Sequence, residues 1–590
     1  MKHISSIVLF WLLSVMMVQG KAYQNFRAAS YVMVQDINRI ATVENWEREW
    51  APYAESCPLD KIYLETYRDE VYVNDDAMKA AIKFFRKKGI EVQGGITYNY
   101  GAGRQRWESF CYSNPKHHDI IRRVAELTAR YFDEIVLDDY YFTNCKCQLC
   151  IDAKGDRSWG EYRCHVLDSV AHVCIVDPAH KVNPKCKVIV KYPNWYDHFH
   201  GLGFDLEHGP YTFDGMYTGT ETRDPRGEQH LQRYESFALI KYLDNLRPGH
   251  NLGGWVDTGG CTYPRAFHEQ LWFTLFAKAP EITIWNFSGM ARPVGRDQQT
   301  RWLQLASEAF RSIDPLLGKL GKPKGIKAYK PFQSEGEDFL HNYMGMVGVP
   351  VEIVPQFPAD EPVILLTECA KYDPQIIDKM KAYIRRGGNC IVTSGFYRAM
   401  QEQGIRSIFE MTVTGRSADI DTVSVPGLWG MPQEYATKVP IRIPCLMYHT
   451  NDSWEFVTGL DYDNGWPMFH HSVYGDGNIY VWTIPDNFSH LYALPAPALD
   501  RIRQVASTGM PVRLMGPARV TLFTYDNGTF VVHNVNTTPV TIRVAIHGKG
   551  ITDLLSGETL HSTPVGLRNP DQVVEIQLEA NSFKGFRVEL

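Results

Sequence analysis

Carboxylate residues follow several short apolar segments in the first half of this 590-residue chain. The pair Asp138-Asp139 is the strongest of these signals, because it stands directly after the apolar segment 135–137. Glu221 and Asp257 follow two later segments in the same way. Hydrolysis of a glycosidic bond requires two carboxyl groups, one as an acid and the other as a nucleophile or base. These four acids are therefore candidates for that chemistry, although any single one could instead cap a helix or pair with Lys or Arg.

Other polar and aromatic residues at the ends of such segments are candidates for substrate binding. Aromatic rings offer a flat apolar surface to a sugar ring, and charged groups can bind its hydroxyl or carboxylate groups. The candidates are Asp36, Glu65, Tyr98, Lys191, Trp195, Arg223, Trp255 and Trp285. An aromatic content of 13% fits large hydrophobic cores as well as it fits sugar-stacking surfaces, so both interpretations stay open.

The elements that must position these residues are strands and helices in alternation. Helical patterns separate the strands, and one of them spans 118–131, with apolar residues spaced along a single face. The strands are expected at 29–35, 61–64, 90–97, 134–137, 186–191, 215–218, 252–256 and 282–287. Eight strands in about 290 residues predict a (β/α)8 TIM barrel, whose active site is built by the loops that follow the strands. This fold would gather the candidate acids at one face.

Two further domains are expected after the barrel. A strand, a helix, a Gly-Gly pair and a second strand follow one another in 362–394, which predicts a small parallel α/β domain. Short alternating strands and the turn signal Asp526-Asn527-Gly528 predict a C-terminal antiparallel β-sandwich. The predicted boundaries are 23–315 for the barrel, 316–510 for the α/β domain and 511–590 for the sandwich.

Residues 1–22 are expected to form a secretory signal peptide. A short polar start precedes the apolar stretch 4–18, and small residues follow at Gly20 and Ala22. No other apolar run reaches the roughly 20 residues of a membrane span. The chain has 61 Lys and Arg residues against 67 Asp and Glu, which argues against a nucleic-acid partner. We therefore expect a bacterial exported protein, periplasmic or secreted, that acts on an oligosaccharide or polysaccharide.

Four cysteines form a second candidate site. Cys145, Cys147 and Cys150 lie in the loop expected after the fourth strand, and Cys111 lies in the loop after the third. Loops that follow neighbouring barrel strands are adjacent in space, so the four thiols could converge on a closed, tetrahedral structural zinc site. Disulfides are the alternative that these residues leave open, because an exported protein meets an oxidising environment.

The order of barrel, α/β domain and small β-domain resembles the family-42 glycoside hydrolases, which are of the β-galactosidase type. The four cysteines match the pattern that carries a structural zinc in many members of that family. The resemblance implies a glutamine-amidotransferase-like fold for the middle domain. It also implies a structural zinc ion, no organic cofactor and a homo-oligomer, most simply a trimer.

The catalytic positions depart from that family. It has an Asn-Glu pair after the fourth strand and a Glu after the seventh, where this sequence has Asp138-Asp139 and Asp257. The Asp-Asp-Tyr sequence is more similar to α-galactosidase and α-fucosidase barrels, in which an Asp after the fourth strand is the nucleophile. This second resemblance implies that Asp139 or Asp138 is the nucleophile and Glu221 the acid/base, and we favour Asp139 as the nucleophile. Asp138 would then orient Asp139, and Asp257 would be the alternative catalytic partner of the acids after the fourth strand.

We expect a retaining glycoside hydrolase that cleaves a plant or host glycan, and two other functions stay open. A glycan-binding barrel without catalysis would use the same carboxylates only to accept hydrogen bonds from sugar hydroxyls. A zinc hydrolase would need an open metal site with His or Asp ligands, for which His198 and His200 beside Asp197 are the hint. Activity against a panel of glycosides distinguishes the hydrolase from the binding protein.

Overall fold

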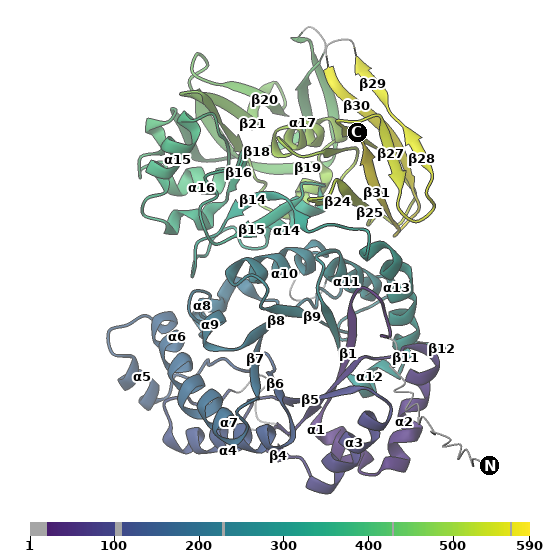
Figure 1. Ribbon diagram of the computed structural model, residues 1–590. Helices are drawn as coiled ribbons and strands as arrows, with labels where there is room; N and C mark the ends of the chain where they lie inside the picture. Colours follow the sequence, from purple (N-terminus) through teal and green to yellow (C-terminus); the bar gives the residue numbers. More distant parts are fainter. Residues whose placement is uncertain (1–20, 101–108, 227–230, 428–429, 567–568) are drawn as a thin grey trace, which may run out of the picture.

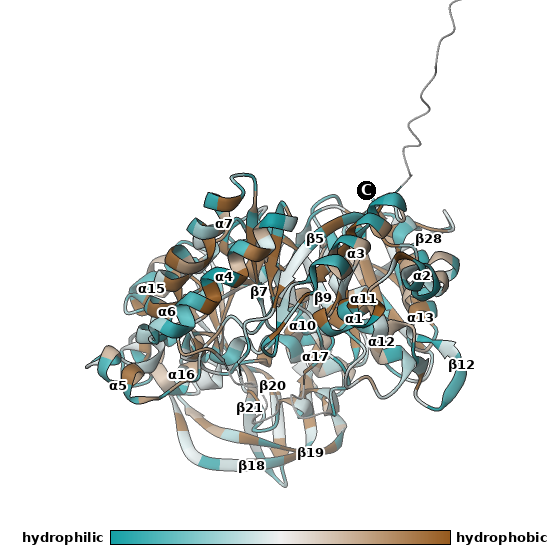
Figure 2. Cartoon of the chain, turned by 90° about the horizontal axis from the view of Figure 1, so that it is seen from below, coloured by the Kyte–Doolittle hydropathy of each residue, from teal (hydrophilic) through white to brown (hydrophobic). Residues whose placement is uncertain are grey.

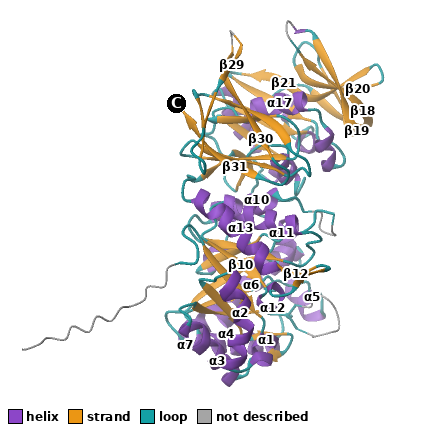
Figure 3. Ribbon diagram, turned by 90° about the vertical axis from the view of Figure 1, so that its right-hand side faces the viewer, coloured by secondary structure: helices purple, strands orange, loops and turns teal. Residues whose placement is uncertain are grey.

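The computed structural model describes residues 21–590, apart from 101–108, 227–230, 428–429 and 567–568. Figure 1 shows a barrel viewed along its axis, with two further domains side by side against one flank. Figure 3 shows the same molecule from the side, with the helix-rich barrel at one end and the strand-rich domains at the other. Most of the expected signal peptide, residues 1–20, lies outside the described residues.

Parallel strands close the barrel within the described residues, in the order β1-β10-β9-β8-β7-β6-β5-β2. The strands are β1 (Arg27–Val32), β2 (Lys61–Glu65), β5 (Glu91–Ile96), β6 (Glu134–Leu137), β7 (Lys187–Tyr192), β8 (Gly215–Gly219), β9 (Asn251–Asp257) and β10 (Glu281–Trp285). They are almost wholly buried, because helices cover their outer face and side chains fill the inside. The predicted TIM barrel is therefore confirmed. The first strand ends earlier than expected, so Asp36 lies in a helix.

The barrel helices follow their strands in sequence. They are α1 (Val34–Ile40), α2 (Val43–Ser56), α3 (Asp75–Lys87), α4 (Pro115–Tyr131), α5 (Gln148–Lys154), α6 (Trp159–Val170), α7 (Asp177–Val182), α8 (Phe199–Leu202), α9 (Gly209–Thr212), α10 (Tyr234–Leu246), α11 (Pro264–Phe276), α12 (Phe287–Met290) and α13 (Trp302–Leu317). The Asn114 side chain caps α4 by accepting a hydrogen bond from the Lys116 backbone, and Pro115 takes the first helical position, where it needs no backbone N–H. Short hairpins join β3 (Tyr67–Arg68) to β4 (Val71–Tyr72), and β11 (Pro293–Val294) to β12 (Asp297–Arg301).

The middle domain is a mixed sheet with helices α14 (Leu340–Met346), α15 (Ile376–Arg385), α16 (Ser394–Met400) and α17 (Ala496–Ala506). Its parallel half contains β14 (Ile326–Tyr329), β15 (Val351–Val354), β16 (Val363–Leu366), β17 (Asn389–Thr393) and β22 (Gly477–Trp482). Its antiparallel half contains β18 (Met411–Pro426), β19 (Pro432–Tyr448), β20 (Trp454–Asp461) and β21 (Asn464–Tyr474). The predicted α/β domain is therefore present, but its sheet is mixed rather than parallel. In Figure 2, β18 and β19 project from the body as a ribbon of mixed hydropathy.

The C-terminal domain packs two antiparallel sheets around one core, as the sequence predicts. One sheet contains β13 (Pro323–Lys324), β24 (Val520–Tyr525), β25 (Thr529–Asn534), β27 (Gly550–Asp553), β28 (Thr559–His561) and β31 (Phe583–Glu589). The other contains β23 (Val512–Met515), β26 (Val540–Ile546), β29 (Thr563–Gly566) and β30 (Asn569–Leu578).

Aromatic contacts fix the C-terminal domain against the barrel helices. The Phe523 ring lies 4.9 Å from that of Phe276 on α11 and 5.5 Å from that of Tyr234 on α10. The Tyr525 hydroxyl donates a hydrogen bond to the Phe276 backbone carbonyl. The sandwich therefore holds the two helices whose first turns follow the loops after β8 and β9. In the described part of the chain no helix has the length and apolar character to cross a membrane.

Candidate active site

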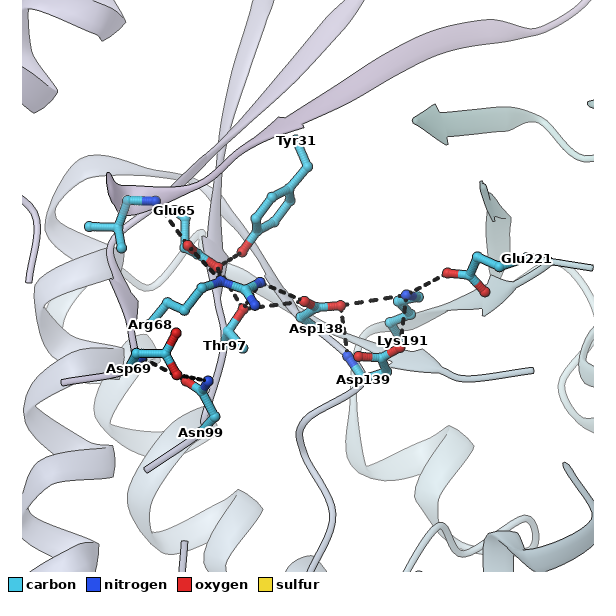
Figure 4. A network of polar contacts seen from close by, with 11 residues as sticks. Tyr31, Glu65, Arg68, Asp69, Thr97, Asn99, Asp138, Asp139, Lys191 and Glu221 are labelled. Carbon is cyan, nitrogen blue, oxygen red and sulfur yellow. Dashed lines mark hydrogen bonds and ion pairs between the residues drawn. The ribbon is translucent and has the colours of Figure 1, made fainter. Parts of the chain in front are cut away.

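A continuous network of charged side chains joins the ends of β2, β6, β7 and β8 (Figure 4). The Arg68 guanidinium donates to Glu65 and to Asp138, each over 2.9 Å. Lys191 Nζ continues the network, because it lies 3.5 Å from Asp138 Oδ1, 3.1 Å from Asp139 Oδ2 and 2.8 Å from Glu221 Oε1. The barrel thus brings three of the four predicted catalytic acids to a single lysine.

Glu65, the last residue of β2, is fully buried. Its carboxylate accepts hydrogen bonds from the Tyr31 hydroxyl, the Thr97 hydroxyl and the Val34 backbone N–H, as well as from Arg68. These contacts occupy both oxygens of a carboxylate that is fully buried, so Glu65 positions Arg68 rather than a ligand. Arg68 is not among the predicted substrate-binding residues. Its position three residues after Glu65, just beyond the end of the same strand, is the sequence signal that could have identified it.

The two adjacent acids have opposite electrostatic environments. Burial opposes ionisation of Asp138, but Lys191 and Arg68 outweigh it and hold the pKa of Asp138 below its ordinary value. Burial raises the pKa of Asp139 to about 7, against the pull of Lys191 and with the help of the negative charges of Asp138 and Glu221. Titratable pairs whose pKa values are pushed apart are the usual mark of an acid with an ionised partner.

Lys191 is the centre of the charged cluster. Its side chain is buried, and its ammonium group lies 4.9 Å from the centre of the Trp255 ring. Burial alone would lower the pKa of Lys191, but the three surrounding carboxylates raise it well above its ordinary value. Lys191 is therefore a fixed positive charge, and its contacts with the protein's own carboxylates account for its position.

Asp257 belongs to a separate ion pair beside this cluster. Arg223 Nη2 lies 2.9 Å from Asp257 Oδ2, and Arg223 Nε lies 3.3 Å from Asp257 Oδ1, so the pair is bidentate. The charges of Glu221 and Asp139 also contribute to the raised pKa of Arg223, after the larger effects of burial and Asp257. Arg223 therefore lies between Asp257 and the Lys191 cluster.

The predicted aromatic residues lie at different depths. Trp255 is fully buried inside the barrel, and Tyr98 is buried with its hydroxyl bonded to the Ile121 carbonyl. Trp285 is partly exposed and has the Arg68 guanidinium 4.6 Å from the centre of its ring. Trp195 is also partly exposed and stacks on the ring of His198. Trp285 and Trp195 are thus the two that can meet a ligand.

Two other predicted positions lie outside the Lys191 cluster. Asp36, in α1, pairs with Arg39 over 3.0 Å. The Nδ1 atom of His198 lies 2.8 Å from Oδ1 of Asp197. Among the residues that the structure describes, metal-ligand geometry occurs only at the cysteine cluster, so nothing at His198 resembles the open zinc site of a hydrolase.

The four cysteines converge after β5 and β6, as the sequence predicts. Cys111 Sγ lies 3.6 Å from Cys147 Sγ and 3.5 Å from Cys150 Sγ, and all four sulfur atoms lie within 4.8 Å of one another. Thiolates bound to zinc at about 2.3 Å in a tetrahedron lie about 3.8 Å apart. Disulfide sulfurs lie much closer, at about 2 Å, and all four thiols are free. The cluster could therefore hold a metal such as zinc.

Family models match the chain in three consecutive segments. Residues 16–319 match the catalytic domain of a probable glycosyl hydrolase, and residues 511–588 match the C-terminal domain of a probable glycosyl hydrolase. Residues 321–487 match the second domain of the uncharacterized protein SSO3021. The chain is 22% identical to SSO3021 from Saccharolobus solfataricus over 579 residues, which is 90% of this chain and 94% of that protein.

Several solved structures share the fold at 12% sequence identity. Alpha-L-fucosidase isoenzyme 2 from Paenibacillus thiaminolyticus has a TM-score of 0.65 and covers 96% of this chain and 99% of its own. The catalytic mutant of Gan42B, a GH42 beta-galactosidase from G. stearothermophilus, has a TM-score of 0.63 and covers 97% and 99%. The beta-galactosidase from Bacillus circulans sp. alkalophilus has a TM-score of 0.62 and covers 96% and 100%.

The catalytic-domain match spans more than half of the chain and contains the charged network and the cysteine cluster. The likeness to the GH42 structures extends over all three domains. The chain therefore belongs to the probable glycosyl hydrolases and has the three-domain architecture of the family-42 β-galactosidases.

Proposed function

We propose that the protein is a retaining glycoside hydrolase in which Asp139 and Glu221 are the catalytic pair. The observation that carries this proposal is their common contact with Lys191 Nζ, at 3.1 Å and 2.8 Å. Two oxygens held by one nitrogen in this way lie within about 6 Å of each other, which fits the ~5–5.5 Å separation of retaining enzymes better than the ~6.5–9.5 Å of inverting ones. Such a pair leaves no room for the water molecule of a single-displacement reaction.

The electrostatics favour Asp139 as the general acid and Glu221 as the nucleophile, which reverses the roles implied by the sequence resemblance. A general acid must hold a proton near neutral pH, and burial raises the pKa of Asp139 to about 7. A nucleophile must be ionised, and Glu221 has the shortest of the three carboxylate contacts with the lysine ammonium. Asp138, which is held by Arg68 and Lys191, orients its neighbour through a hydrogen bond from the Asp139 backbone N–H.

The reaction would proceed in two balanced steps. Asp139 donates its proton to the glycosidic oxygen while a Glu221 oxygen bonds to the anomeric carbon, and the leaving sugar departs as an alcohol. The glycosyl ester removes the negative charge of Glu221, which is one of the charges that raise the pKa of Asp139. Asp139 is therefore a stronger acid in the intermediate and stays ionised until it takes a proton from the attacking water. Water releases the sugar and restores both carboxyl groups.

We propose an exported, periplasmic or secreted enzyme whose substrate is a plant or host glycan. Support for export comes from the polar, apolar and small residues of the first 22 positions. The resemblance to family-42 enzymes supports a homotrimer, and the similar structures include both a β-galactosidase and an α-L-fucosidase. Aryl galactosides and aryl fucosides of both anomers are therefore the first substrates to test.

The test is hydrolysis of such a panel by the wild type and by Asp139→Asn and Glu221→Gln variants. We expect wild-type turnover of at least one glycoside and a loss of several orders of magnitude in kcat/KM in each variant. Proton NMR of the first product should show retention of the anomeric configuration. Binding of glycans without turnover of any glycoside by the wild type would instead identify a non-catalytic glycan-binding barrel.

A further inference from the structure

A cationic cavity is lined in part by residues that follow Glu221 and Asp257 in the sequence, among them Arg226 and Tyr263. Its volume is about 670 Å³, and its walls come from all three domains. The lining residues come from the barrel, the middle domain and the C-terminal domain. They are Pro225, Arg226, Gln232, Arg233, Tyr263 and Arg265 of the barrel, Tyr343, Met346, Asn487, Ser489 and Tyr492 of the middle domain, and Arg519 of the C-terminal domain. This volume is within the range of pockets that bind small ligands.

Four arginines line the cavity, and two of them, Arg265 and Arg519, form no direct ion pair in the described part of the chain, although their charges act on the buried Glu269. Arg226 forms a bidentate pair with Asp224, and the buried Arg233 pairs with Glu269. Arg265 donates to the side-chain carbonyl of Asn581, which carries no charge. Arg519 Nε is buried and has no hydrogen-bond partner among the described residues.

The walls of the cavity also suit a sugar. Tyr263 lies between arginines, with the Arg265 guanidinium 4.7 Å and the Arg226 guanidinium 5.4 Å from the centre of its ring. Tyr343 and Tyr492 of the middle domain also line the cavity, with their ring centres 5.7 Å apart. Aromatic rings and guanidinium groups together are the surface that binds a ring with an anionic substituent, because the rings stack and the arginines form bidentate hydrogen bonds.

We propose that this cavity binds an acidic sugar unit of the glycan, a uronate whose carboxylate pairs with Arg519 and Arg265. The inference rests on the proposed glycosidase function and narrows its substrate to acidic glycans. The cavity adjoins the catalytic site through one loop, because Arg223 pairs with Asp257 and the next residue, Asp224, holds Arg226 at the cavity wall. One glycan chain that crosses the loops after β8 and β9 would therefore meet both sites.

The test is calorimetric titration of the full-length mature protein with galacturonate and with galactose, which differ only in the carboxylate at C6. We expect galacturonate to bind and galactose to bind at least about tenfold more weakly, since a charge-assisted hydrogen bond contributes roughly that factor. Arg519→Gln and Arg265→Gln should each weaken galacturonate binding about tenfold or more. Arg587→Gln removes an exposed arginine of the same domain and is the matched control, with unchanged binding.

Three outcomes would overturn the proposal: equal binding of both sugars, equal binding of inorganic sulfate, or full affinity in both cavity variants. Circular dichroism of each variant checks that the fold is kept. Binding is measured without turnover, so failure of the cavity assignment and failure of the proposed function give different results. Galacturonate binding without hydrolysis of any glycoside would refute the glycosidase and leave the cavity assignment standing. Hydrolysis of neutral glycosides without galacturonate binding would do the reverse.

Discussion

Replacing Asp139 by Asn should abolish catalysis and stabilise the protein at the same time. The pKa of this carboxyl is about 7 in the folded chain, against an ordinary value of 3.8. A raised pKa in an acid means that the folded state holds the proton longer than the unfolded state does. Folding is therefore penalised increasingly as the pH rises from about 4 to 7, and at about 1.4 kcal/mol for each pKa unit the full penalty is about 4 kcal/mol.

The amide introduced by Asp139→Asn would have nearly the same shape as the carboxyl and would keep an oxygen for Lys191, but it would carry no charge. The free energy of unfolding of this variant should equal that of the wild type near pH 4 and exceed it by up to about 4 kcal/mol at pH 8. Urea unfolding followed by tryptophan fluorescence at a series of pH values measures this difference. A difference between the two proteins that does not change with pH would refute the proposed state of Asp139.

Asp138→Asn is the matched control, because the same substitution one residue earlier should act in the opposite direction. Lys191 and Arg68 overcome the effect of burial and lower the pKa of Asp138, so its charge stabilises the fold above its unfolded pKa, and this stability is lost as the pH falls. Removing the charge leaves two buried cations with fewer partners. We expect a loss of about 3 kcal/mol at pH 8, the order found when one partner of a buried pair is removed.

Three further predictions follow from the site. The kcat/KM of the wild type should fall above a pH of about 7 as Asp139 loses its proton, and a profile flat to pH 9 would exclude it as the acid. Purified protein should contain one zinc ion per chain by elemental analysis, whereas Cys150→Ala should lose the metal and unfold at a lower temperature; metal-free wild type of equal stability would contradict this. Light scattering should give the mass of a trimer, and a monomer mass would refute that assembly.

The barrel and the cysteine cluster could be predicted because their signals are local and topological. Each barrel strand is buried on both faces and stands out as an apolar segment, and the alternation with helices then dictates which loops are neighbours. Cys111 and the three later cysteines follow consecutive strands, so closing the barrel was enough to bring them together. The antiparallel half of the middle sheet, β18 to β21, was missed because register shifts between Val413 and Ser417 and between Ile420 and Thr422 break the two-residue alternation along β18.

Depth within the barrel could not be read from the sequence. Trp255 and Asp257 stand two residues apart on β9, so both side chains point to the inside of the barrel. Trp255 belongs to the packed core inside the barrel, whereas Asp257 lies in the next layer, where the active site is. Which of the two adjacent aspartates holds a proton was equally hidden, because it depends on Arg68 and Lys191, which come from other strands.

Burial, together with an excess of acids over cations, explains why Asp139 holds a proton. Glu65, Asp138, Asp139 and Glu221 share only two cations in the described network, Arg68 and Lys191. A buried excess of negative charge is unfavourable, and binding a proton is the simplest way to reduce it. In the proposed cycle this proton leaves Asp139 in the same step that turns Glu221 into a neutral ester. The two cations therefore face three negative charges before and after the step, so the protein needs no rearrangement of its own charges to reach the intermediate.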